Sequence, residues 1–320
     1  MLSAVPLGSW PLWLGFVLFI VGMLALDLGV FHRRPHVVSL REAALWSAAW
    51  VALSALFAAG VFLLYGSQRG LEFTTGYLIE KALSLDNVFV IVLIFSAFGV
   101  PAHQQHRVLF WGILGALTMR AFFILAGVAL IARFHWMLYV LGAFLVLTGV
   151  KALVASRAPP PHPEDSVVLR RARRVLPVAP GRETEHFFVQ VNGKRMVTLL
   201  FLALLAVEVT DLIFAVDSIP AVLAVSEVPF IVFTSNIFAI LGLRSLYFLL
   251  AGAVQKFRYL KTGLALVLVF VGAKMTIVDI LHIPAGVSLA VVAVLIGGAI
   301  LASLVADGRR RALQERTATS

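Results

Sequence analysis

Long apolar runs alternate with short polar stretches along most of this 320-residue chain. A helix needs about 20 predominantly apolar residues to cross the hydrocarbon core of a bilayer. On that criterion we expect an all-α fold, a polytopic membrane helix bundle of about nine transmembrane helices. The predicted spans are residues 10–31, 43–65, 75–98, 108–130, 135–154, 198–220, 229–252, 261–281 and 283–305.

The composition supports a membrane protein and excludes several kinds of site. The chain is 61% hydrophobic and 13% charged, whereas about a quarter of the residues of a soluble domain are charged. It has no cysteine, which excludes disulfides and thiolate metal ligands. It also lacks a His-Glu-x-x-His zinc motif, a serine elbow and a glycine-rich phosphate loop. We therefore expect no enzyme, no organic cofactor and no nucleic-acid partner.

Basic residues gather in alternate loops. Nineteen of the 26 Lys and Arg residues lie in the stretches 32–42, 99–107, 155–197 and 253–261 and in the tail from 306. The opposite loops contain only Arg69 and Arg133. Because basic loops remain cytoplasmic, we predict that the N-terminus lies outside and the C-terminus inside.

The one long polar loop, residues 155–197, is predicted to be cytoplasmic. It begins with the proline-rich stretch 159–163, which favours extended backbone, and continues with an arginine cluster at 170–174. Topology control and attraction to anionic lipid account for that cluster better than a partner surface does. Residues 186–195 read as a strand followed by an Asn-Gly turn, which predicts a small hairpin.

Several ionisable residues interrupt the apolar spans. A charged side chain near the centre of a membrane helix costs about 2.5–3.5 kcal/mol on insertion scales, so a partner is required: a pore, a cation or one another. The acids within spans are Asp27, Glu80, Asp86, Glu208, Asp211, Asp217 and Asp279, and the bases are Lys81, Arg120, Arg244 and Lys274.

Five of these seven acids fall in two spans, the third and the sixth. Each span contains an acid, then five residues, then Asp and a short polar residue. The matched pairs are Glu80 with Asp211, Asp86 with Asp217, and Asn87 with Ser218.

The match continues in the spans that follow. An arginine leads to Ala-Gly in both halves, from Arg120 and from Arg244, and Gly149-x-Lys151 corresponds to Gly272-x-Lys274. The third span runs inward and the sixth outward, which predicts an inverted three-plus-three helix repeat, an arrangement that places a substrate site near the midplane. The predicted units are 1–74 (two helices), 75–154 (repeat 1), 155–197 (loop), 198–281 (repeat 2) and 282–320 (last span and tail).

A straight helix cannot direct all these acids at one ion. At about 100° per residue, Glu80 and Asn87 share a face, and Asp86 points about 120° away. The sixth span repeats this geometry and has Pro220 two residues after its polar pair. We therefore expect both acidic segments to be locally unwound.

The acidic set predicts a divalent metal ion as transported substrate. Carboxylate, amide and hydroxyl oxygens suit Mg²⁺, Ca²⁺ and Mn²⁺. A cation entering a cluster of carboxylates displaces protons, so transport is expected to be proton-linked. The alternative is that the acids pair with the buried bases to hold the bundle together: Arg120, Arg244, Lys81 and Lys274. For Asp27 and Asp279, which lie near span ends, we favour that structural role. The predicted ligands are Glu80, Asp86, Asn87, Glu208, Asp211, Asp217 and Ser218.

Glu80-Lys81-Ala82-Leu83-Ser84-Leu85-Asp86-Asn87 and Asp211-Leu212-Ile213-Phe214-Ala215-Val216-Asp217-Ser218-Ile219-Pro220 resemble the signature of the TerC family. Phe230–Asn236, Leu241–Arg244 and Glu185–Val189 extend the match, and the last resembles the Alx-like branch. The resemblance implies a bacterial inner-membrane protein of the LysE-like transporter superfamily that exports manganese.

The same resemblance carries the acidic motif residues over as ligands and adds Asn236 as a supporting amide, beside Arg120 and Arg244. It leaves other roles open: a membrane partner or sensor that delivers metal to exported enzymes, through the secretion machinery, or a tellurium-resistance protein. The expected partners are the lipid bilayer and Mn²⁺.

Overall fold

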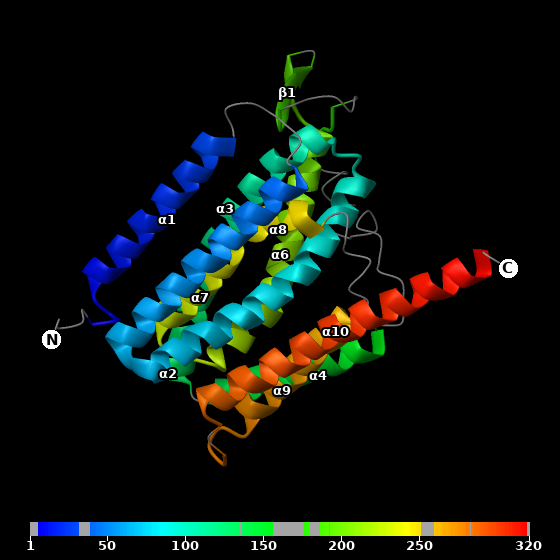
Figure 1. Cartoon of the computed structure of the whole chain (residues 1–320). Coiled ribbons are helices and arrows are strands. Elements are labelled where there is room, and N and C mark those ends of the chain that lie inside the picture. The colour runs from blue at the N-terminus through cyan, green and yellow to red at the C-terminus, as the bar shows by residue number, and fades with distance from the viewer. Residues whose placement is uncertain are drawn as a thin grey trace.

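The computed structural model describes residues 6–31, 39–134, 136–155, 176–179, 186–191, 193–250, 259–281 and 283–318; side chains of 26–31, 86, 89, 155, 217, 250, 261 and 307–318 are excepted. Helices make up almost all of this part of the chain, which confirms an all-α membrane protein (Figure 1). The helices are α1 (Trp10–Phe31), α2 (Leu40–Ala97), α3 (Ala102–Arg133), α4 (Met137–Ala155), α6 (Leu199–Leu223), α7 (Pro229–Leu241), α8 (Leu243–Leu250), α9 (Leu260–Thr276) and α10 (Ala285–Ala318).

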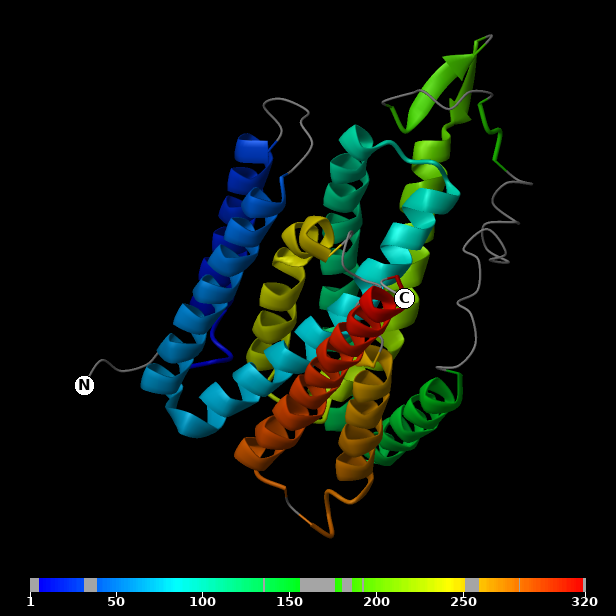
Figure 2. The same ribbon diagram turned by 45° about the vertical axis from the view of Figure 1, so that its right-hand side comes forward.

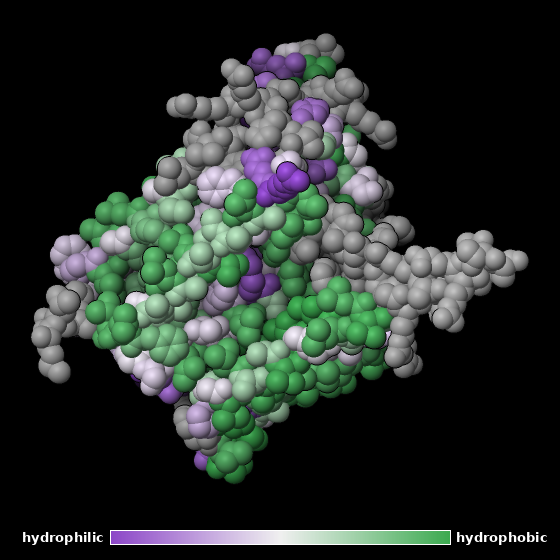
Figure 3. Space-filling view, viewed as in Figure 1, coloured by the Kyte–Doolittle hydropathy of each residue, from purple (hydrophilic) through white to green (hydrophobic). Residues whose placement is uncertain are grey.

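Six helical segments among the described residues are long and apolar enough to cross a membrane, and α1 and α9 contain shorter apolar stretches. The count of nine spans and the inverted repeat remain predictions. The exterior fits a lipid environment: Figure 3 shows hydrophobic residues over most of one face, with hydrophilic ones near the hairpin end and in a small patch near the middle.

Helix α2 combines two predicted spans, 43–65 and 75–98. Its 58 residues would measure about 87 Å if straight, far more than the roughly 30 Å core of a bilayer. A sharp bend at Gly66, whose φ of 87° is outside the helical region, reverses the direction of the chain (Figures 1 and 2). The predicted loop 66–74 is therefore wrong, because only Gly66 departs from helical geometry.

The predicted unwinding of the acidic segments is also wrong. Residues 80–87 and 211–218 are helical throughout. Pro220 lies in the last turn of α6, which ends at Leu223, so its missing N–H removes one hydrogen bond near the end and does not break the helix. The polar side chains bond back to the helix: the hydroxyls of Ser84 and Thr210 donate to carbonyls four residues earlier.

The predicted span 229–252 is divided into α7 and α8 at Gly242. Lys81 of α2 stabilises this break, since its Nζ donates to the carbonyl oxygen of Ala239 at 3.2 Å and a cation favours the C-terminal end of a helix. A Cβ at position 242 would lie 2.7 Å from Lys81 Nζ and 3.3 Å from Trp50 Cβ. Glycine at position 242 therefore leaves space for the ammonium group of Lys81.

Helices α4 and α9 pack against each other through glycines. A Cβ at Gly149 would lie 2.8 Å from the Ala265 carbonyl oxygen and 2.9 Å from the Val269 nitrogen. A Cβ at Gly272 would lie 2.6 Å from the Gly142 oxygen and 2.8 Å from the Val146 nitrogen. The same spacing in sequence separates 149 from 272, 142 from 265 and 146 from 269, so the contacts are reciprocal, as in a two-fold interface.

The remaining helices surround the acidic segments. Helix α2 packs on α6, α7 and α8, α3 packs on α6, and α10 covers α9 and α2 (Figures 1 and 2). Helix α1 packs on α7 and α2 through aromatic rings. The ring centroids of Trp13 and Phe230 of α7 are 5.3 Å apart, and those of Phe16 and Phe57 of α2 are 5.8 Å apart. The acidic segments of α2 and α6 are thus in the interior of the bundle.

The predicted hairpin is confirmed. Strands β1 (Phe188–Val191) and β2 (Lys194–Val197) pair antiparallel across a two-residue turn, with Gly193 at φ 75°. The Thr198 hydroxyl then accepts from the Phe201 N–H and caps α6. The proline-rich stretch 159–163 and the arginine cluster 170–174 lie outside the described residues.

Candidate functional site

Arg120 is the centre of a buried polar cluster between the two acidic helices. Its side chain, on α3, is 1% exposed, and Glu80 of α2 is completely buried. The two side chains form an ion pair through Arg120 Nη1 and Glu80 Oε1. The same guanidinium reaches α6, where Nη2 donates to Asp211 Oδ1 at 3.2 Å and Nε to Oδ2 at 3.5 Å.

Three neutral side chains complete the cluster. Arg120 Nη1 also donates to Ser218 Oγ at 3.2 Å and to Asn236 Oδ1 at 3.3 Å. Asn236 Nδ2 donates to Glu80 Oε2 at 3.0 Å, and Asn87 Nδ2 is 3.5 Å from Asp211 Oδ1. All three are buried. The cluster therefore draws on α2, α3, α6 and α7.

Most of the sequence-predicted set is brought together here: Glu80, Asn87, Asp211, Ser218, Asn236 and Arg120. Asp86 and Asp217 lie on α2 and α6 beside these residues in sequence, but their side chains, like that of Asp27, are outside the described ones. Arg244 is buried at the first turn of α8.

Two other predicted acids lie outside the hydrogen-bonded cluster. The Glu208 carboxylate, one helical turn before Asp211, contacts Gly115 of α3, where the Cβ of any other residue would overlap it. Asp279 is exposed after the end of α9 and accepts a hydrogen bond from the Tyr139 hydroxyl of α4. Asp279 therefore lies outside the Arg120 cluster, and the structural role expected for it stays a prediction.

Among the described side chains, no group of three or more His, Asp or Glu is placed to hold a metal ion. The physical reason is visible in the cluster. Glu80 and Asp211 are separated by the guanidinium of Arg120, which bonds both. In this conformation both carboxylates therefore bind the guanidinium of Arg120.

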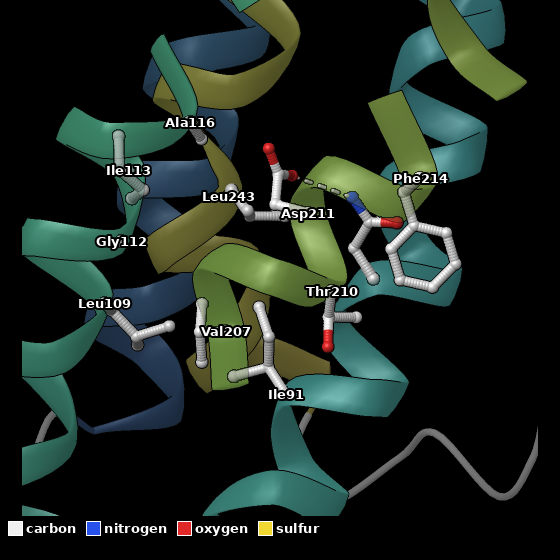
Figure 4. Close-up of a pocket in the computed structure, with 11 residues that line it drawn as sticks. Ile91, Leu109, Gly112, Ile113, Ala116, Val207, Thr210, Asp211, Phe214 and Leu243 are labelled. Atoms are coloured by element: carbon white, nitrogen blue, oxygen red, sulfur yellow. Dashed lines mark hydrogen bonds between the residues drawn. The ribbon is translucent and has the colours of Figure 1, made fainter. Parts of the chain in front are cut away.

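A small cavity adjoins the cluster between α2, α3, α6 and α8. It measures about 20 Å³ as the space open to the centre of a water molecule, and about 10–15 Å³ is enough for one water. Asn87 and Asp211 supply its polar lining, together with Thr210 (Figure 4). Asn87 Oδ1 is buried without a hydrogen-bond partner among the described residues, so one residue of this lining carries an unsatisfied acceptor.

A larger cavity of about 410 Å³ lies at the Gly66 end of the bundle, lined by polar groups that include Arg69, Glu72 and Lys274. Glu72 is 5% exposed and accepts from Arg69 Nη1 at 2.7 Å, Gln68 Nε2 at 2.9 Å and Ser226 Oγ at 2.7 Å. Sequence reasoning missed Glu72 because it fell in the predicted loop 66–74. Its spacing of eight residues from Glu80, about two helical turns, was the available signal.

The two cavities lie on opposite sides of the cluster along both acidic helices. On α2, Glu72 of the large cavity precedes Glu80, and Asn87 of the small cavity follows it. On α6 the order is reversed: Thr210 of the small cavity comes first and Leu223 of the large cavity last, with Ser218 between them. The Arg120 cluster therefore separates two chambers.

Between Glu72 and Glu80, α2 is packed tightly at Gly76. A Cβ there would lie 2.8 Å from Ser235 Oγ of α7 and 3.1 Å from Val222 Cγ1 of α6. Helices α2, α6 and α7 therefore approach one another closely between the cluster and the larger cavity.

Comparisons with known proteins agree on the kind of protein. The family model described as the integral membrane protein TerC family matches residues 65–311. An uncharacterized membrane protein of Myxococcus xanthus is 58% identical over 298 residues, 93% of each chain. A Salmonella typhi protein described as a membrane-bound redox modulator, Alx, is 50% identical over 294 residues, 89% of this chain and 91% of the relative. No solved structure matches the chain.

Proposed function

Because this chain belongs to the TerC family of integral membrane proteins, we propose that it exports a divalent metal ion, Mn²⁺, across the bacterial inner membrane. The observation that carries the proposal is the convergence of Glu80 and Asp211, from two different helices, in the interior of a membrane bundle. Ionisable groups at such depth are costly, and they mark ion pathways in membrane proteins.

The chemistry of the cluster fits a hard divalent cation. Its side chains offer carboxylate, amide and hydroxyl oxygens, the ligands of Mg²⁺, Ca²⁺ and Mn²⁺. The resemblance to manganese exporters favours Mn²⁺ within this group. Asp86 and Asp217, the adjacent acids in the paired motifs, are proposed to complete the site as the cargo ion passes.

We propose that the two cavities are parts of the pathway of the ion. On the predicted topology the hairpin end faces the cytoplasm, so the small cavity beside Asp211 is the inner chamber and the large cavity beside Glu72 is the outer one. Glu208, one turn from Asp211 on the inner side, would receive the ion first. The tight contact at Gly76 then closes the outer passage in this conformation.

Alternating access requires a change in which passage is closed. The reciprocal glycine contacts of α4 and α9 support an inverted repeat, because they join the third helices of the two proposed units as a two-fold interface does. In such transporters one unit rocks against the other around a fixed site. Protons displaced from the carboxylates by the ion would couple this motion to the proton gradient.

A second candidate follows from the description of the Salmonella typhi relative as a redox modulator. This chain has no cysteine, so its own side chains cannot exchange thiols and disulfides. A carrier that changes the supply of a redox-active metal ion would modulate redox chemistry indirectly. A partner that delivers metal to exported enzymes, with the secretion machinery, would do the same without moving the ion itself.

Purified protein in liposomes that enclose an Mn²⁺-sensitive dye tests the proposal. We expect Mn²⁺ flux above that of empty liposomes, slowed at least about tenfold in Asp86→Asn and Asp217→Asn, since the loss of one strong ligand contact exceeds 1.4 kcal/mol. Asp279→Asn, outside the cluster, is the matched control. No flux with folded wild-type protein would favour the delivery role, and flux indifferent to a pH gradient at fixed voltage would exclude proton coupling.

A further inference from the structure

The acceptor oxygens of Glu80, Asp211 and their neighbours are arranged to hold a guanidinium. Nε, Nη1 and Nη2 of Arg120 all donate, and the acceptors come from both acidic helices and from α7. The two asparagines support this state, since Asn236 and Asn87 each direct an amide N–H₂ at a carboxylate. An N–H₂ group cannot ligate a metal ion, so in this state the two amide nitrogens act as donors to the carboxylates and not as ligands.

We propose, on the basis of the transport function above, that Arg120 is a built-in competitor of the cargo ion. Its guanidinium occupies Glu80 and Asp211 when the site is empty. A divalent cation displaces it from one or both carboxylates, and its return expels the ion. Arg120 is thus a positioning residue that sets the affinity of the site and resets the empty carrier.

The charges favour such an exchange. Glu80 and Asp211 carry two negative charges, which Arg120 reduces to one and a doubly charged ion reduces to zero once the guanidinium has left. Both cations together would leave an excess positive charge among buried groups. Because two cations on the same buried carboxylates repel each other strongly, binding of one disfavours binding of the other.

The unsatisfied acceptor distinguishes an exchange site from a permanent ion pair. A structural network is stable when every buried member is satisfied. Here Asn87 Oδ1 is buried without a partner among the described residues, beside a cavity large enough for one water-sized guest. Asp211 lines the same cavity (Figure 4) and also bonds Arg120. Asp211 therefore contacts both the guanidinium and a cavity that Arg120 does not line.

Mn²⁺ binding to purified protein in nanodiscs, measured by calorimetry, tests the exchange. Arg120→Gln keeps a hydrogen-bonding group but removes the competing charge, so it should bind Mn²⁺ about tenfold tighter or more, a change of 1.4 kcal/mol or more. Its maximal transport rate should fall, because nothing expels the ion. Arg120→Lys carries a point charge that cannot form the planar fork. Its affinity for Mn²⁺ should lie between those of the wild type and Arg120→Gln. Arg41→Gln, at an exposed arginine at the start of α2, is the control.

Each result of this measurement either supports or overturns the exchange of Arg120 for the ion. Tighter binding with slower turnover supports the exchange. Binding by folded Arg120→Gln that equals the wild type, or is weaker, overturns it. If both Arg120 variants fail to fold, the guanidinium is a permanent structural group and the proposal is overturned as well. Wild-type protein that neither binds nor moves Mn²⁺ refutes the transport function itself, a result distinct from a wild type that transports while its Arg120→Gln variant binds no tighter.

Discussion

Arg120 and Asp211, from different helices, meet in the interior of the bundle through two parallel hydrogen bonds, Nη2 to Oδ1 at 3.2 Å and Nε to Oδ2 at 3.5 Å. This fork joins α3 to α6, and the ion pair between Arg120 and Glu80 extends it to α2. A single guanidinium therefore connects both acidic helices.

Shortening Asp211 should weaken the bundle. Asp211→Ala removes the acceptor of two guanidinium donors, and hydrogen bonds to charged groups contribute about 1.5–3 kcal/mol each. We expect a loss of roughly 2–4 kcal/mol in unfolding free energy, measured by denaturant titration in detergent. Asp279→Ala should cost less, because Asp279 is exposed. Equal losses for the two variants would contradict the central position of Arg120.

Gly76 should tolerate no side chain. The Cβ of Gly76→Ala would lie 2.8 Å from Ser235 Oγ, and overpacking of this kind costs about 1–3 kcal/mol. Gly60→Ala is the matched control on the same helix, since nothing lies within 4 Å of its Cβ. The unfolding temperature and the Mn²⁺ flux should both fall in Gly76→Ala, and neither should fall in Gly60→Ala.

A second substitution checks the cause of that effect. Ser235→Ala removes the hydroxyl that the new Cβ meets, so the double variant should recover part of the loss. Absence of any coupling between positions 76 and 235 would show that α2 and α7 do not approach as closely as the structure indicates.

The α4–α9 interface should respond symmetrically. In Gly149→Ala and in Gly272→Ala the new Cβ meets backbone atoms of the other helix within 3 Å, and a helix backbone cannot move aside cheaply. Both should be destabilised, by amounts equal to within about 0.5 kcal/mol, the usual error of such comparisons. Gly297→Ala of α10, with nothing within 4 Å, should be neutral. Strongly unequal effects would argue against a two-fold interface.

Glu72 should anchor the larger cavity. It accepts from Arg69, Gln68 and Ser226 while nearly fully buried. Glu72→Ala should cost about 2 kcal/mol or more, because charge-assisted bonds are lost, whereas Glu227→Ala, at an exposed position of the same cavity, should cost little. A double-mutant cycle with Ser226→Ala should show coupling of about 0.5–3 kcal/mol; additive effects would contradict the contact between α2 and the α6–α7 loop.

The sequence alone matched Glu80 with Asp211 and Asn87 with Ser218, and the structure brings these four residues into one cluster. Their role as metal ligands stays a prediction. The sequence also predicted the hairpin from an Asn-Gly turn, a purely local signal. These successes rest on patterns within one segment or on the match between two.

Long-range packing could not be predicted in the same way. Arg120 was expected near the site in a supporting or structural role, but nothing in its own segment shows that its guanidinium nitrogens donate to three other helices, α2, α6 and α7. The unwinding was wrong because Pro220 lies in the final turn of α6, where a missing N–H costs little. Glu72 was missed because one glycine, Gly66, suffices to reverse α2.

Mn²⁺ flux through liposomes containing the Glu80→Gln and Asp211→Asn double variant is the most direct test, with Asp279→Asn as control. Both exchanges keep the shape and leave one acceptor oxygen on each side chain while removing the two negative charges. We predict that the folded double variant moves no Mn²⁺ above empty liposomes, whereas wild type and control do. Flux at the wild-type rate in the double variant would contradict a passage of the ion over these carboxylates.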